Sequence, residues 1–118
     1  MVLMFSTRRV LLTTALMLGV WPLASLRIAA QDAKHGAQVY TAQKCQMCHA
    51  IAGKGSKANP LDGVGAKLSA DDIRQWIVNP TEMAAKAKST KKPPMPNKYS
   101  TLPAADIDGL VAYMQSLK

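Results

Sequence analysis

Two cysteines and a histidine stand together in the pentapeptide Cys45-Gln46-Met47-Cys48-His49, and the chain has no other cysteine. The spacing C-x-x-C-H is typical of covalent attachment of a c-type haem. Two thiols add to the two vinyl groups of the porphyrin as thioethers, and one turn of backbone presents both sulfurs to adjacent vinyls. An imidazole directly after the second thiol suits an axial position on the iron. The pentapeptide therefore predicts one haem c, bound through Cys45 and Cys48, with His49 as an iron ligand.

Three other interpretations explain less of this pentapeptide. A thioredoxin-like redox pair needs a βαβ context, and the sequence shows no β-rich pattern. A zinc site needs a second pair of ligands, and the only other histidine is His35. A structural disulfide gives no reason for a histidine beside the second cysteine.

A second iron ligand is predicted in the segment Pro93-Pro94-Met95-Pro96. Three prolines exclude regular helix and strand there and stiffen the loop, so Met95 is presented in a restricted geometry. A thioether is a soft donor for the sixth position on haem iron, and histidine–methionine ligation raises the reduction potential. The alternative is a methionine that fills a gap in the core. Met83 and His35 are weaker candidates for the same position.

Residues 1–30 have the layout of a secretory signal. Arg8 and Arg9 precede an apolar run of 17 residues between Arg9 and Arg27, and small residues end at Ala30. We expect cleavage after Ala30, export to the periplasm, and a single domain over residues 31–118. The apolar run is at the lower limit of what spans a bilayer, so an uncleaved anchor over residues 10–28 is the alternative, and only then is a membrane an expected partner.

The expected mature domain is small and moderately basic. It keeps 12 of the 15 basic residues and all 7 acidic ones, so its net charge is 12 − 7 = +5. A domain of this size buries little surface and usually needs a staple, a role that a covalently bound haem fills. The lysines form no run longer than two and aromatic residues do not interleave with them, so nucleic acid is not an expected partner.

Apolar periodicity and turn residues predict an all-α domain. The first helix is expected over residues 33–42 with Asp32 as its cap, and the last over residues 103–117. Between them, Ser69 caps a helix that Asn79-Pro80 ends, and a short helix is expected around residues 83–87. Residues 51–65 are rich in Gly, Lys, Ser and Asn and are expected to form a loop along one edge of the haem.

Trp76 is the large aromatic residue of the second expected helix. Together with Ile73 and Ile77 it forms an apolar face at i, i+3 and i+4. We interpret Trp76 as part of the core or of the wall of the haem site, where its indole N–H could reach a haem propionate.

The whole expected mature region resembles the small class I c-type cytochromes. The resemblance is carried by the attachment pentapeptide, by a proline-bracketed methionine 46 residues after His49, and by helices at both ends. It implies three to five helices around one haem, with crossed terminal helices. Gly36 and Tyr40 would be the first partner in that crossing, and Leu110 and Tyr113 the second.

The resemblance also implies a proline after the haem motif whose carbonyl accepts the other N–H of the axial histidine. The chain departs from the family pattern Gly-Pro-x-Leu-x-Gly, because Asn59-Pro60-Leu61-Asp62-Gly63 has one residue fewer between proline and glycine. Pro60 and Asn59 are therefore both candidates for this carbonyl.

The expected function is transfer of single electrons between redox partner proteins, and no enzymatic activity is expected. Iron with two protein ligands has no open position for a substrate. Two alternatives remain: a haem-bearing subunit of a membrane-bound oxidoreductase, and a small-ligand or peroxide-reactive haem protein if Met95 is not a stable ligand. Six lysines near the attachment and ligand segments are candidates for a basic rim that attracts acidic partners: Lys44, Lys54, Lys57, Lys91, Lys92 and Lys98.

Overall fold

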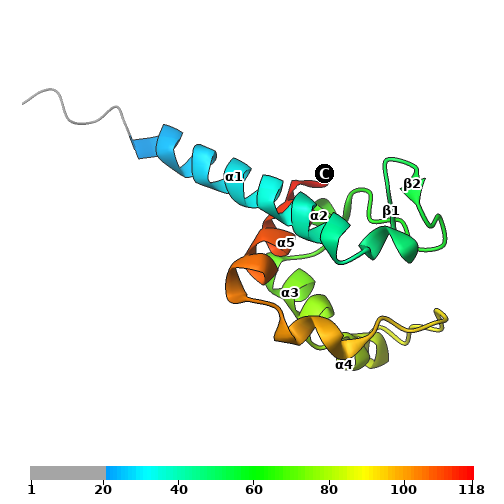
Figure 1. Cartoon of the computed structure of the whole chain (residues 1–118). Coiled ribbons are helices and arrows are strands. Elements are labelled where there is room, and N and C mark those ends of the chain that lie inside the picture. The colour runs from blue at the N-terminus through cyan, green and yellow to red at the C-terminus, as the bar shows by residue number, and fades with distance from the viewer. Residues whose placement is uncertain (1–20) are drawn as a thin grey trace, which may run out of the picture.

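The computed structural model describes the chain from Trp21 to Lys118, and its side chains from Ala29 onward. This part is mostly helical, which confirms the predicted all-α class (Figure 1). Its elements in chain order are α1 (Trp21–Ala42), the 3-10 turn η1 (Cys45–Met47), β1 (Ala50–Ile51), β2 (Lys54–Gly55), α2 (Val64–Lys67), α3 (Ala70–Val78), α4 (Pro80–Lys86), η2 (Asn97–Thr101) and α5 (Ala104–Ser116).

Helix α1 begins earlier than the sequence predicted. Asp32 does not cap it, because the helix is continuous from Trp21. Pro22 lies in the first turn, where a missing N–H is tolerated, and no proline or glycine follows before Gly36. The amino-terminal end of α1 projects from the rest of the domain (Figure 1). Residues 1–20 of the predicted export segment, which covers residues 1–30, lie outside the part of the chain that the structure describes.

A search for membrane-spanning helices over the described part of the chain found none with the length and apolar character required.

Helices α1 and α5 cross in close contact, as the resemblance implied. A Cβ atom on Gly36 would lie only 1.8 Å from the carbonyl oxygen of Gly109, so the two backbones touch at this point. One turn further along, the Tyr40 and Tyr113 rings meet edge to face with centroids 5.8 Å apart. Gly109, which the sequence analysis did not select, is thus the direct partner of Gly36.

Helix α3 forms where local signals predicted it. The Ser69 side chain accepts a hydrogen bond from the Asp72 amide at 3.1 Å, which satisfies one free donor of the first turn. Asn79 is the C-cap, and Pro80 begins α4 at once, because a helix accepts proline at its first position. The short helix expected around residues 83–87 is α4, and it starts three residues earlier.

The core lies between α1, α3 and α5. Its buried cluster draws two residues from α1, two from α3 and three from α5: Val39, Tyr40, Ile73, Ile77, Leu110, Val111 and Met114. Trp76 is half-buried and does not pack against this cluster. The interpretation of Trp76 as a core residue is therefore wrong, and its place on the wall of the haem site stays a prediction.

The segment after the pentapeptide is mostly irregular, as expected, but it contains one small antiparallel hairpin. Ala50 pairs with Gly55 and Ile51 with Lys54. Gly55 has φ +105°, and a Cβ atom there would lie 2.2 Å from the His49 carbonyl oxygen. Only glycine therefore lets the hairpin fold back this closely over the end of the pentapeptide.

Candidate functional site

The pentapeptide forms a single tight turn that holds both cysteines. Lys44 is in the left-handed region with φ 56°, and η1 follows it directly. The amides of Cys48 and His49 donate to the Cys45 carbonyl at 3.1 and 2.9 Å. Both thiols are free; Cys45 is half-buried and Cys48 is exposed. Burial raises the pKa of the Cys45 thiol.

The imidazole of His49 is fixed by one hydrogen bond. Its Nδ1–H donates to the Asn59 carbonyl at 3.1 Å, so Nε2 is the nitrogen left to bind a metal. Burial lowers the pKa of His49, and the bond to Asn59 raises it in part. A lowered pKa favours the neutral imidazole, which carries the lone pair that a ligand needs.

The carbonyl that holds His49 belongs to Asn59, not to Pro60. Pro60 is exposed and instead forms a parallel bridge with Ala50. The Asn59 carbonyl also accepts from the Ala50 amide at 3.3 Å, and the Asn59 side-chain amide donates to the Cys48 carbonyl at 3.2 Å. Asn59 thus fixes both the imidazole and the backbone of the attachment turn.

Met95 is half-buried in the loop between α4 and η2. The two elements that flank this loop are joined by a hydrogen bond. The Thr81 hydroxyl, at the start of α4, donates to the side-chain oxygen of Asn97, at the start of η2, at 3.0 Å. Burial raises the pKa of Tyr99, and negative charge on the nearby Cys45 and Cys48 sulfurs raises it further. Tyr99, which follows Met95, and Cys45 of the pentapeptide both pack against the buried cluster of α1, α3 and α5.

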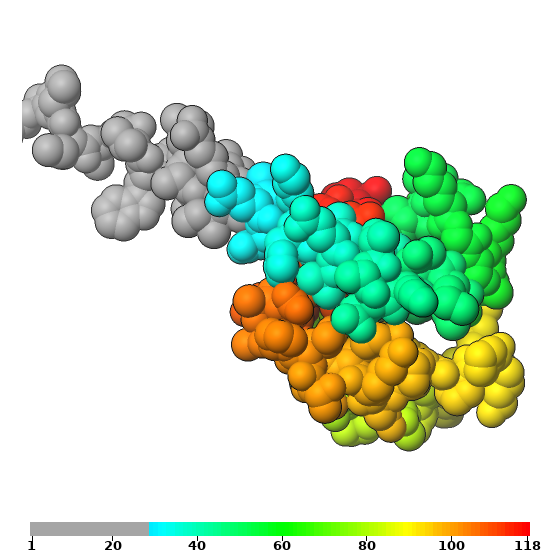
Figure 2. Space-filling view, in the orientation of Figure 1, coloured from blue at the N-terminus to red at the C-terminus, as the bar shows by residue number. Residues whose placement is uncertain are grey.

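The surface is hollowed between these two parts of the chain. Figure 2 shows the hollow between the segment around residues 45–60, in green, and the loop around residue 90, in yellow. The predicted ligands His49 and Met95 belong to the segments on its two sides. Helix α3, which carries Trp76, packs against α4 and η2, the elements that flank the Met95 loop.

His35 is engaged elsewhere. Its Nε2 lies 2.8 Å from an oxygen of Asp106, so it links α1 to the start of α5 at the helix crossing. This contact places His35 in the helix interface as a structural residue.

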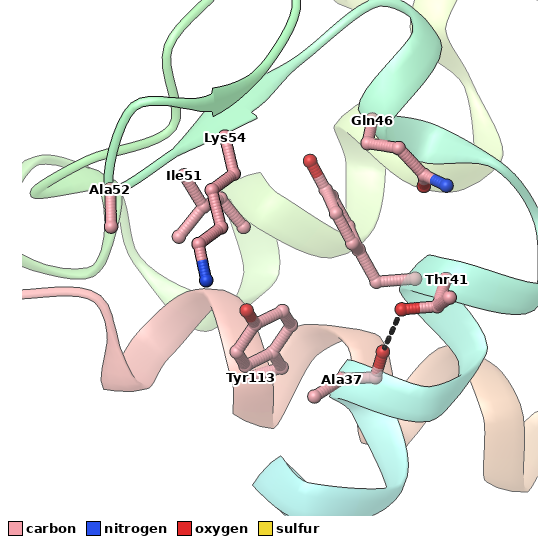
Figure 3. A pocket seen from close by; sticks show the side chains of 8 residues that line it. Ala37, Thr41, Gln46, Ile51, Ala52, Lys54 and Tyr113 are labelled. Carbon is pink, nitrogen blue, oxygen red and sulfur yellow. Dashed lines mark hydrogen bonds between the residues drawn. The ribbon is translucent and has the colours of Figure 1, made fainter.

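A separate groove of about 450 Å³ lies between α1, α5 and the hairpin. Tyr40, Gln46, Lys54 and Tyr113 line it (Figure 3). None of the predicted haem ligands contributes to its lining. The groove is therefore distinct from the hollow between the His49 and Met95 segments.

Comparison with known proteins adds one decisive finding. The sequence model of the family described as cytochrome c matches residues 33–118. The chain belongs to the cytochrome c family. No curated protein and no solved structure matched it.

Membership implies electron transfer by haem and redox partner proteins. Members of the cytochrome c family bind haem c through two cysteines, and both are present here as Cys45 and Cys48.

The residues of this cytochrome c fit a haem. The donor set is two free thiols in one turn, an imidazole with Nε2 unused, and a half-buried thioether carried by the loop on the other side of the hollow. Sulfur and imidazole nitrogen are the donors that haem proteins of this class use. The Asn59 bond supplies the second-shell contact that orients an axial histidine.

Proposed function

We propose that this cytochrome c carries single electrons between redox partner proteins. Cys45 and Cys48 would hold haem c covalently, and His49 and Met95 would supply the protein donors to its iron. The observation that carries the proposal is the His49–Asn59 hydrogen bond, which leaves Nε2 of a half-buried imidazole free beside two thiols. When bound, the haem supplies a ferric–ferrous couple.

The protein residues would fix both donors to the iron and exclude other ligands from it. His49 is fixed by Asn59, and Met95 is presented by a loop with three prolines, so both donors are preorganised. With both residues bound to it, the iron would have no position open to oxygen, peroxide or another substrate. This supports a carrier rather than an enzyme.

Replacement of the thioether tests the ligand assignment. We expect Met95→Ala to abolish the red charge-transfer band of a sulfur–iron bond in the ferric protein, because alanine offers no donor. The reduced variant should also bind carbon monoxide readily, whereas the wild-type protein should not.

Met83→Ala is the matched control, because Met83 is half-buried on α4 and is the next candidate thioether. A band that survives in Met95→Ala and disappears in Met83→Ala would overturn the assignment.

We propose further that the chain is exported to the periplasm and cleaved after Ala30. The support is the signal-like layout of residues 1–30 and the attachment of c-type haem outside the cytoplasm. The mass of the purified protein tests this: we expect loss of residues 1–30 and gain of one haem. A mass that retains residues 1–30 would favour the anchored alternative.

A further inference from the structure

The loop that carries Met95 is held at both ends by hydrogen bonds. At its start, the amides of Lys88 and Ser89 donate to Ala85 and Ala84 at 3.1 and 2.9 Å. At its end, Thr81 bonds to Asn97. Between these ends the loop has to cross beside the hollow of Figure 2.

The prolines stiffen the loop locally, but backbone hydrogen bonds do not anchor its middle to the rest of the described domain. Pro93, Pro94 and Pro96 have no N–H. Among the described residues, no backbone amide from Lys92 to Asn97 donates to a backbone carbonyl. A side-chain hydrogen bond can anchor this stretch where backbone bonds do not.

Lys91 makes that bond. Its ammonium Nζ donates to the Ala58 carbonyl at 3.1 Å, across 33 residues of sequence. Ala58 directly precedes Asn59, whose carbonyl holds His49 and whose amide holds the Cys48 carbonyl. The contact therefore joins the Met95 loop to the segment that fixes the opposite ligand.

We propose that Lys91 is a positioning residue, a strap that closes the Met95 loop onto the His49 side of the haem site and keeps the thioether on the iron. This inference rests on the proposed ligation by Met95. A hydrogen bond from a charged donor is stronger than a neutral one, and one lysine placed four residues before Met95 restrains the loop without crowding the ligand.

The test uses the ferric holoprotein and three variants. Lys91→Met removes the donor and keeps the aliphatic stem, whereas Lys91→Arg keeps a charged donor. Lys92→Met removes the same charge one residue away, and the Lys92 ammonium makes no hydrogen bond to the described residues. Added imidazole displaces the thioether, and at saturation its binding rate equals the rate at which the thioether leaves.

We expect Lys91→Met to raise this limiting rate about fivefold, the effect of losing one exposed hydrogen bond from a charged donor. Lys91→Arg and Lys92→Met should stay within about twofold of the wild-type protein. Hydrogen exchange of the peptide over residues 88–97 should accelerate in Lys91→Met and in neither of the other two.

Equal limiting rates in Lys91→Met and Lys92→Met would contradict the proposed role of Lys91, because the loss of a positive charge alone would then explain the effect. A limiting rate of imidazole binding in Lys91→Arg as high as that in Lys91→Met would also contradict the proposal. Failure of the ligand assignment looks different: the wild-type protein would then lack the sulfur–iron band. In that case hydrogen exchange over residues 88–97 still reports whether Lys91 holds the loop.

Discussion

Asn59 shows which parts of a site can be predicted residue by residue. The attachment pentapeptide could be predicted from the sequence because covalent attachment of haem requires those side chains at that spacing. The partner of His49 could be narrowed only to Asn59 or Pro60, because every residue has a backbone carbonyl. The Ala50–Pro60 bridge sets the path of the loop and brings the Asn59 carbonyl, not that of Pro60, to Nδ1. Such a choice depends on tertiary contacts that the sequence pattern does not contain.

A charge placed at residue 59 should change the redox properties of the site. Asn59→Asp removes the donor to the Cys48 carbonyl and adds a carboxylate close to His49. Negative charge there stabilises the more positive ferric state, and we expect the midpoint potential to fall by about 40 mV, equivalent to ~1 kcal/mol. Potentiometric titration of the holoprotein measures this.

Asn59→Ala is the control, because it removes the same donor without adding charge, and it keeps the backbone carbonyl that holds His49. Its potential should stay close to that of the wild-type protein. Equal potentials for the aspartate and alanine variants would show that the carboxylate does not sense the iron.

At the scale of elements, the sequence predicted the helices that have clear local start and stop signals and missed the features that lack them. Helix α3 was predicted well because Ser69 and Asn79-Pro80 mark its ends. The start of α1 was missed because Asp32 can cap a helix or lie within one, and no residue near it breaks the helix. The two-residue strands at the hairpin are too short to leave a sequence pattern.

The contact between α1 and α5 should be intolerant of a single methyl group. Gly36→Ala would place its Cβ 1.8 Å from the Gly109 carbonyl oxygen, so the helices must separate. We expect a loss of about 3 kcal/mol in the free energy of unfolding, the upper range for overpacking. Denaturant unfolding of the holoprotein, followed by circular dichroism, gives this value.

Gln38→Ala on the exposed side of the same helix is the matched control. It should change stability by less than about 0.5 kcal/mol. Equal stability of Gly36→Ala and Gln38→Ala would mean that the two helices do not touch at Gly36.

At the scale of the whole molecule, charge determines which partners approach. The six lysines of the predicted basic rim are all exposed. Two of them also have contacts of their own: Lys91 with the Ala58 carbonyl, and Lys98 over the Tyr99 ring at 5.2 Å. Lys54 lies beside Tyr113 and lines the separate groove, not the hollow between the His49 and Met95 segments (Figure 3).

A net positive charge should speed association with acidic redox proteins. We expect the second-order rate of electron exchange with such a partner to fall about tenfold between 0.01 and 0.15 M ionic strength, as salt screens long-range attraction. Stopped-flow kinetics measures the rate. A neutral small-molecule reductant serves as the control and should show little dependence on salt. If the rate with the acidic partner were also independent of salt, electrostatic steering would be excluded.

The crossing of the terminal helices also determines when, during synthesis of the chain, the domain can close around the attachment turn. The contacting residues His35 and Asp106 are 71 positions apart, so the interface cannot form until the last helix has been synthesised and released. Until then the attachment turn lies on an open chain, accessible to the machinery that joins porphyrin to thiol. Placing the closing contact at the two ends of the domain thus keeps the cysteines available for as long as the chain is incomplete.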